Sequence, residues 1–261
     1  MPRQLLALLL SFTLPAALLT AAEWTGWRGP NGDAKVSAGS LPTAWAAGKN
    51  VVWKTKTPGP GTACPLVVGE RIYTTYYTGY GLAAGQGDQK QLLRHLLCLD
   101  RKSGEVQWTK VFQPKLPEHR YAGEGAYHGY AASTPATDGK HLYLFLGKSG
   151  VFCLDLDGKQ VWHADVGGGI NGWGSGTSPV LYKGLVIVNA SVESGSIVAL
   201  DQQTGREVWK TGGMSSSWTI WLPYQGSSFT WLKNEDTSML RTRTGSPAPG
   251  RSARSPPDYS R

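Results

Sequence analysis

The chain is poor in charge and in cysteine. Only 17% of its 261 residues are charged, against about 25% in ordinary globular proteins, and it lacks the glutamate and lysine of a coiled coil. Cys64, Cys98 and Cys153 form no Cys-x-x-Cys or Cys/His spacing, so the sequence predicts neither a zinc centre nor a haem attachment. Three isolated cysteines also give no disulfide framework.

Long hydrophobic runs are absent after residue 22. The first 22 residues combine Arg3, an apolar stretch over 5–19 and three small residues at 20–22, the pattern of a signal peptide cleaved before Glu23. The apolar stretch is shorter than the about 20 residues of a transmembrane helix, although an uncleaved anchor is the alternative. We therefore predict an exported protein of the periplasm or cell envelope, or a secreted one, with no transmembrane span after signal removal.

The basic balance does not point to nucleic acid. The net charge is +8, but lysine and arginine are scattered through the chain rather than clustered among aromatic residues, as a nucleic-acid interface requires. The sequence therefore predicts a solvated basic surface and no nucleic-acid partner.

Glycine and aromatic residues are abundant. There are 34 glycines and 11 tryptophans, and 40% of residues are hydrophobic. Glycine costs roughly 1 kcal/mol per position in a helix, so a long helical protein is excluded, and the hydrophobic content argues against disorder over most of the length. Many turns between short apolar segments favour an all-β domain.

One pattern repeats three times. Each copy begins at a Pro-containing strand and ends at Trp108, Trp162 or Trp209, which lie 54 and 47 residues apart. In the third copy, four strands are expected at about 178–181, 185–190, 196–201 and 208–211. A four-stranded unit of this length is a propeller blade, and we expect blades over about 63–112, 133–166 and 177–213.

An N-terminal segment copies the last strand of a blade. Val51-Val52-Trp53-Lys54 matches Val208-Trp209-Lys210. We expect residues 51–54 to form a closing strand that follows a leader at 23–50, and thus three full blades in an incomplete β-propeller ring.

The segment 199–209 resembles the tryptophan-docking repeat of PQQ-like β-propellers, Ala-x-Asp-x-x-Thr-Gly-x-x-x-Trp. Segments 98–108 and 153–162 match it less closely, and the leader 24–32 resembles that of exported bacterial members of this family. The resemblance implies that each tryptophan packs between neighbouring blades against a glycine turn. The structural docking positions are then Trp53, Trp108, Trp162, Trp209, Gly104, Gly158 and Gly205.

The same register predicts free thiols. Cys98 and Cys153 occupy equivalent positions in adjacent blades. Packed sheets lie about 10 Å apart, beyond the roughly 7 Å between Cα atoms that a disulfide spans.

The resemblance also implies a pyrroloquinoline quinone cofactor with calcium, as in quinoprotein dehydrogenases. Those enzymes carry an adjacent cysteine pair and a set of Glu, Asn and Asp calcium ligands, and no such set can be carried over to this sequence. We assign no catalytic residue, no metal site and no cofactor, and the absence of a Gly-x-Ser-x-Gly elbow gives no support for nucleophilic catalysis. The sequence leans away from an enzyme.

Loops at one mouth of the central channel are the candidate ligand site, because loops on a rigid ring usually carry ligand contacts. The candidates are Tyr127, His128, Asn171 and Trp173. The alternative is that glycines in these loops permit a crowded crossing that the aromatic residues merely cover.

The repeat stops after Gly213. Residues 214–261 carry no docking pattern, and we expect a largely disordered tail. One hypothesis is a truncated gene or a frame shift near residue 218; the alternative is a genuine disordered tail.

The favoured function is an exported, non-catalytic propeller that serves as a scaffold for protein interaction or envelope assembly, with other proteins or further blades as partners. The family resemblance includes assistance to outer-membrane protein assembly, although no lipobox cysteine stands at the predicted cleavage point. One alternative is a remnant of a PQQ-dependent quinoprotein oxidoreductase. Another is carbohydrate or small-ligand binding at the channel mouth.

Overall fold

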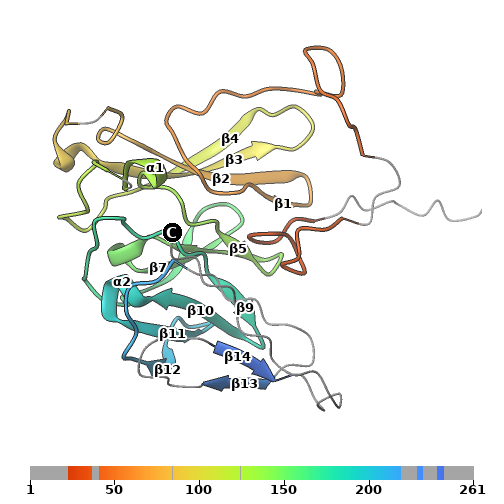
Figure 1. Ribbon diagram of the computed structural model, residues 1–261. Coiled ribbons are helices and arrows are strands. Elements are labelled where there is room, and N and C mark those ends of the chain that lie inside the picture. Colours follow the sequence, from red (N-terminus) through yellow and green to blue (C-terminus); the bar gives the residue numbers. More distant parts are fainter. Residues whose placement is uncertain are drawn as a thin grey trace, which may run out of the picture.

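The computed structural model describes residues 23–36, 41–83, 85–123, 125–218, 228–231 and 240–243, the last two ranges by their backbone alone. Its main body is three separate four-stranded antiparallel sheets, each connected strand to neighbouring strand. Figure 1 shows these sheets following one another as stacked layers. The predicted all-β architecture with three four-stranded blades is confirmed.

Each blade takes its strands in chain order. Blade 1 comprises β1 (Leu66–Val68), β2 (Arg71–Thr78), β3 (Leu93–Asp100) and β4 (Val106–Phe112); blade 2 comprises β5 (Ala136–Thr137), β6 (His141–Phe145), β7 (Val151–Asp155) and β8 (Gln160–Ala164); blade 3 comprises β9 (Val180–Tyr182), β10 (Leu185–Ala190), β11 (Ser196–Asp201) and β12 (Glu207–Thr211). Short helices interrupt the connections: η1 (Gln89–Gln91), α1 (Gly125–His128), η2 (Gly147–Ser149) and α2 (Ser191–Ser194). No helix within the described ranges is long and apolar enough to span a membrane.

The repeated Asp and Gly shape the turn between the third and fourth strands. In blade 1 the backbone N–H groups of Lys102 and Ser103 donate to Asp100 Oδ1 at 2.9 and 2.8 Å. In blade 3 the N–H group of Thr204 donates to Asp201 Oδ1 at 2.8 Å. A short carboxylate that accepts N–H groups two and three residues ahead stabilises a tight turn, so one sequence pattern produces one hairpin geometry.

The core lies between the blades. Leu66, Tyr73 and Leu96 of blade 1 pack with Leu142 and Leu154 of blade 2, all of them fully buried. A second cluster joins blade 2 to blade 3 in the same way; its members include Tyr143, Val151, Trp162, Val186 and Leu200. Strand alternation explains this arrangement, because residues two apart share a face and each face meets a neighbouring sheet.

Three docking tryptophans lie against the glycine turn of the blade that follows. The ring of Trp53 contacts Gly104, and a β-carbon at Gly205 would stand 2.6 Å from the ring of Trp162. Both indole N–H groups also donate to a turn carbonyl, from Trp53 to Arg101 at 2.9 Å and from Trp162 at 3.1 Å. The glycines have φ of +72°, where the missing β-carbon permits both the backbone and the close ring contact.

The middle docking contact differs. The ring of Trp108 lies by Gly158, where a β-carbon would stand 3.0 Å away. Its indole N–H finds no hydrogen-bond partner in the described part of the chain. The turn in blade 2 is one residue shorter than in the other blades, so the carbonyl that the other tryptophans use is displaced.

Residues 51–54 were predicted to form a closing strand, and this is wrong. The chain from 51 to 57 has no strand hydrogen bonding, although Trp53 takes the docking position on blade 1. A strand requires a hydrogen-bonded partner strand, and no strand in the described ranges pairs with this segment, although Trp53 packs against Tyr76 and Leu97 of blade 1. The leader instead pairs Trp24 with Val67 of β1 through two backbone hydrogen bonds of 2.9 and 3.0 Å.

All three cysteines are free, which confirms the prediction for Cys98 and Cys153. These two thiols lie buried in different inter-blade clusters. In the tail, β13 (Ser228–Trp231) and β14 (Leu240–Arg243) pair as a two-stranded sheet. The predicted signal peptide at 1–22 and the remainder of the tail lie outside the described residues.

Candidate functional site

The loops that enter blades 2 and 3 meet η2 and α2 at one end of the blades, which we call the loop face. Lys115 of the first loop donates its backbone N–H to Ser149 Oγ of η2 at 3.0 Å. Gly169 of the second loop donates its N–H to the carbonyl of Glu193 in α2 at 2.9 Å. Segments far apart in the sequence are thereby fixed against one another.

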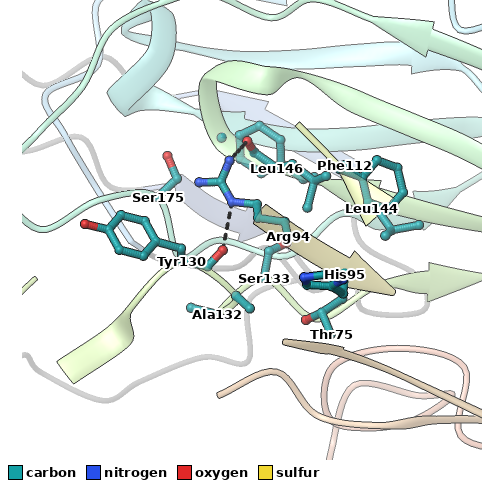
Figure 2. A pocket seen from close by; sticks show the side chains of 13 residues that line it. Thr75, Arg94, His95, Phe112, Tyr130, Ala132, Ser133, Leu144, Leu146 and Ser175 are labelled. Carbon is teal, nitrogen blue, oxygen red and sulfur yellow. Dashed lines mark hydrogen bonds between the residues drawn. The ribbon is translucent and has the colours of Figure 1, made fainter. Parts of the chain in front are cut away.

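A buried ion pair lies at the centre of the loop face. Arg94 of β3 and Glu118 of the first loop approach to 2.8 Å, with both side chains 7% exposed, although their atoms are not aligned for a hydrogen bond. Arg94 also donates from Nε to the carbonyl of Tyr130 at 2.8 Å and from a terminal nitrogen to that of Leu146 at 3.3 Å. Figure 2 shows the guanidinium reaching from β3 toward these carbonyls, with Ser175 close by. The ion pair therefore ties blade 1 to the loops above blade 2.

A carboxyl group and an ammonium group lie deeper than charged side chains usually do. Glu193 is 5% exposed, and its Oε1 accepts a hydrogen bond from the Ser175 hydroxyl. Burial raises the pKa of Glu193 to about 7. Lys148 of η2 is 7% exposed and donates to the carbonyl of Pro117 at 2.8 Å, with no carboxylate partner among the described residues.

His119 completes this group. It is 4% exposed and packs against Tyr130 with ring centroids 4.5 Å apart and planes tilted by 35°. Within the described ranges neither ring nitrogen has a hydrogen-bond partner, although the ring lies near the backbone of Gly125. Burial lowers the pKa of His119 to about 4, so the ring is neutral at neutral pH and offers one donor and one acceptor.

Gly174 makes room for this histidine. A β-carbon there would stand 2.5 Å from His119 Cε1, and φ is +72°. Gly174 is therefore required for the close approach of the two loops. This agrees with the alternative interpretation of these loops, in which their glycines permit a crowded crossing.

The candidate contacts from the sequence divide into two groups. The rings of His128 and Trp173 lie 6.5 Å apart, and Trp173 also packs on Trp218 at 5.3 Å. Asn171 accepts the backbone N–H of Trp173 at 3.0 Å, so these residues are brought together. Tyr127 is 79% exposed on α1 and makes no ring contact with them.

Sequence reasoning missed the buried polar group: Arg94, Glu118, His119, Lys148, Ser175 and Glu193. One signal was available. Arg94 shares a strand face with the apolar Leu96 and Cys98, and a charge at a core position is seldom found without a partner. The remaining members carried no signal, because they come from turns and loops.

The repeat and the docked blades agree with comparisons to known proteins. Residues 94–220 match the family model described as outer membrane protein assembly factor BamB. The chain is similar to proteins of the PQQ-like β-propeller family. Among curated proteins, this propeller is 29% identical over 145 residues to the outer membrane protein assembly factor BamB of Burkholderia pseudomallei (strain K96243), which covers 56% of the chain. The chain spans 28% of the length of that relative.

Solved structures with a similar fold include BamB from Moraxella catarrhalis, with 18% identity, a TM-score of 0.41 and coverage of 63% of this chain and 43% of that one. A europium-containing methanol dehydrogenase gives 23% identity, a TM-score of 0.36 and coverage of 56% and 24%. The quinohemoprotein alcohol dehydrogenase from Comamonas testosteroni gives 20% identity and a TM-score of 0.38, and the match covers 59% of this chain and 21% of that one.

The described residues do not fit a pyrroloquinoline quinone and calcium centre. Among them no group of three or more His, Cys, Asp or Glu side chains is placed to hold a metal ion. The cysteines are separate, and Cys98 and Cys153 are buried within inter-blade clusters.

Proposed function

We propose that this propeller is a non-catalytic scaffold for protein interaction in the assembly of the cell envelope. Its similarity to outer membrane protein assembly factors supports this class of function. The fold supplies a rigid array of docked sheets whose loop face is held by internal contacts such as the Arg94–Glu118 ion pair. The proposal includes export to the periplasm or envelope through residues 1–22, and partners that are other proteins or further blades.

The observation that carries the proposal is the exposure of the last docking tryptophan. Trp162 is 8% exposed because blade 3 covers it, whereas Trp209 at the equivalent position of blade 3 is 38% exposed. Each earlier docking tryptophan meets a glycine turn of a following blade. The same position on β12 is thus a surface that fits another blade or a partner with such a turn.

Site-specific photo-crosslinking in cells tests this proposal. A photoreactive phenylalanine analogue at position 209 should give adducts with an envelope-assembly protein or with another propeller blade. The matched control is the same analogue at position 162, which should react within the chain near Gly205. Absence of any intermolecular adduct at position 209, with the expected internal adduct at 162, would contradict the scaffold function.

Localisation is tested separately. The mature protein should begin at Glu23 and fractionate with the periplasm or envelope. A cytoplasmic protein that retains residues 1–22 would contradict export. The cross-linking result would be unaffected, because it tests protein contact and not location.

A further inference from the structure

A small hollow opens on the loop face between the loops that enter blades 2 and 3. Its lining includes Glu118, His119, Lys148, Asn171 and Ser175. We propose that this hollow and the exposed ring of Trp173 beside it bind one sugar residue of a carbohydrate, with a sugar hydroxyl inside the hollow. Such a site goes beyond the scaffold function and does not depend on it.

The polar groups in the hollow are suited to hydroxyls. His119 is 4% exposed, and neither ring nitrogen makes a well-aligned hydrogen bond in the described ranges, although the backbone of Gly125 is close enough to affect its pKa; as a neutral ring it has one donor and one acceptor to satisfy. A hydroxyl group supplies both. Lys148 spends one N–H on the Pro117 carbonyl and retains donors for a hydroxyl oxygen, and Glu118 retains acceptor capacity for a hydroxyl proton.

The size of the hollow fits the same ligand. Its empty volume is about 180 Å³ with open solvent included, less than the roughly 300–1,000 Å³ of pockets that enclose a drug-sized molecule. The interior has room for about one water-sized group. One hydroxyl can take that place while the rest of the sugar stays at the surface.

The rim provides an apolar platform for that remainder. Trp173 is 45% exposed and Ile170 is 49% exposed, and Trp173 stands between the lining residues Asn171 and Gly174. The Trp173 ring is fixed from below by Trp218, 5.3 Å away, and Trp218 donates its indole N–H to the carbonyl of Gly174 at 2.9 Å. A fixed, half-exposed indole offers area for the C–H face of a sugar ring at little cost in side-chain entropy.

A small anion fits less well. Arg94 is already paired with Glu118, and Lys148 already donates to the carbonyl of Pro117, so a single ammonium group is left to attract an anion. The carboxylate of Glu118, the ammonium group of Lys148 and the imidazole of His119 together match a neutral ligand that both donates and accepts hydrogen bonds.

Titration of the full chain with sugars tests the proposal. Glucose, galactose, N-acetylglucosamine and their β-linked disaccharides are added while tryptophan fluorescence and saturation-transfer NMR are recorded, with sodium acetate and sodium phosphate as the anion probes. We expect saturable binding of at least one sugar and none of either anion. No binding by any of these sugars, or binding of an anion instead, would overturn the proposal.

Variants locate the bound sugar. Trp173→Ala and Lys148→Met should each weaken sugar binding about tenfold or more. The first variant removes the stacking surface, and the second removes a charged hydrogen-bond donor. Trp45→Ala, at a tryptophan that is 65% exposed in the leader, is the matched control and should bind like the wild type. If Lys148→Met does not fold, Asn171→Ala at the rim takes its place. Equal affinity of Trp173→Ala and Trp45→Ala would refute the site, and cross-linking at position 209 should be the same in both.

Discussion

Replacement of Glu193 by glutamine should change how stability depends on pH. Burial raises the pKa of this carboxyl from an ordinary value of 4.5 to about 7. The folded chain therefore holds the proton more tightly than the unfolded chain does, and the free energy of unfolding falls as pH rises from about 4.5 to about 7. At about 1.4 kcal/mol per pH unit the total is about 3 kcal/mol.

Glutamine keeps an oxygen for the Ser175 hydroxyl and cannot ionise. The difference in unfolding free energy between Glu193→Gln and wild type should thus rise, in favour of the variant, by about 3 kcal/mol between pH 4.5 and pH 8. The comparison cancels the opposite contribution of His119, whose lowered pKa makes stability fall as pH drops from about 6.5 to about 4.

Urea unfolding followed by tryptophan fluorescence at several pH values measures this difference. Glu207→Gln is the matched control, because Glu207 is exposed on β12, and its difference from wild type should stay nearly constant with pH. A Glu193→Gln difference that also stays constant would refute the assignment of a buried, proton-holding carboxyl to this position.

Three further outcomes are expected. Gly205→Ala should lower the free energy of unfolding by about 3 kcal/mol, because this residue has a φ of +72° and its β-carbon would stand 2.6 Å from the Trp162 ring. The control Gly184→Ala, at a φ of +78° with no atom within 4 Å, should lower it by about 1 kcal/mol. Equal losses of the two variants in urea unfolding would refute the docking contact. Trp162→Ala should lower the free energy of unfolding by about 3–5 kcal/mol, whereas Trp209→Ala, at a more exposed residue, should lower it by about 1 kcal/mol. The two variants should therefore differ clearly in unfolding temperature. Ellman's reagent at pH 8 should modify only the half-buried thiol of Cys64 in the folded chain and all three thiols in urea; fast modification of a second thiol before unfolding would contradict the buried register.

The blades could be read from the sequence because their rules are local. An Asp that accepts turn N–H groups, a Gly with positive φ and a Trp in the following strand recur at fixed offsets, and the strands expected at 185–190 and 196–201 match β10 and β11 residue for residue. Tertiary context overrode this local signal at residues 51–54. Their sequence resembles a last strand, but they pair with no strand in the described ranges.

The loop face could not be read in this way. Arg94, Lys148 and Glu193 are separated by about fifty residues each and meet only because successive blades stack. A single sequence carries no signal for which loop charges will face one another across that stack. Asn171 and Trp173 were predicted because loop position alone suggested exposure, whereas His119 is hidden behind Gly174.

Deletion of the gene tests the central claim most directly. If the propeller is an envelope-assembly scaffold, quantitative proteomics of the outer membrane should show reduced amounts of β-barrel proteins in the deletion strain, and the wild-type gene should restore them. Unchanged β-barrel protein levels in a strain proven to lack the chain would contradict the account.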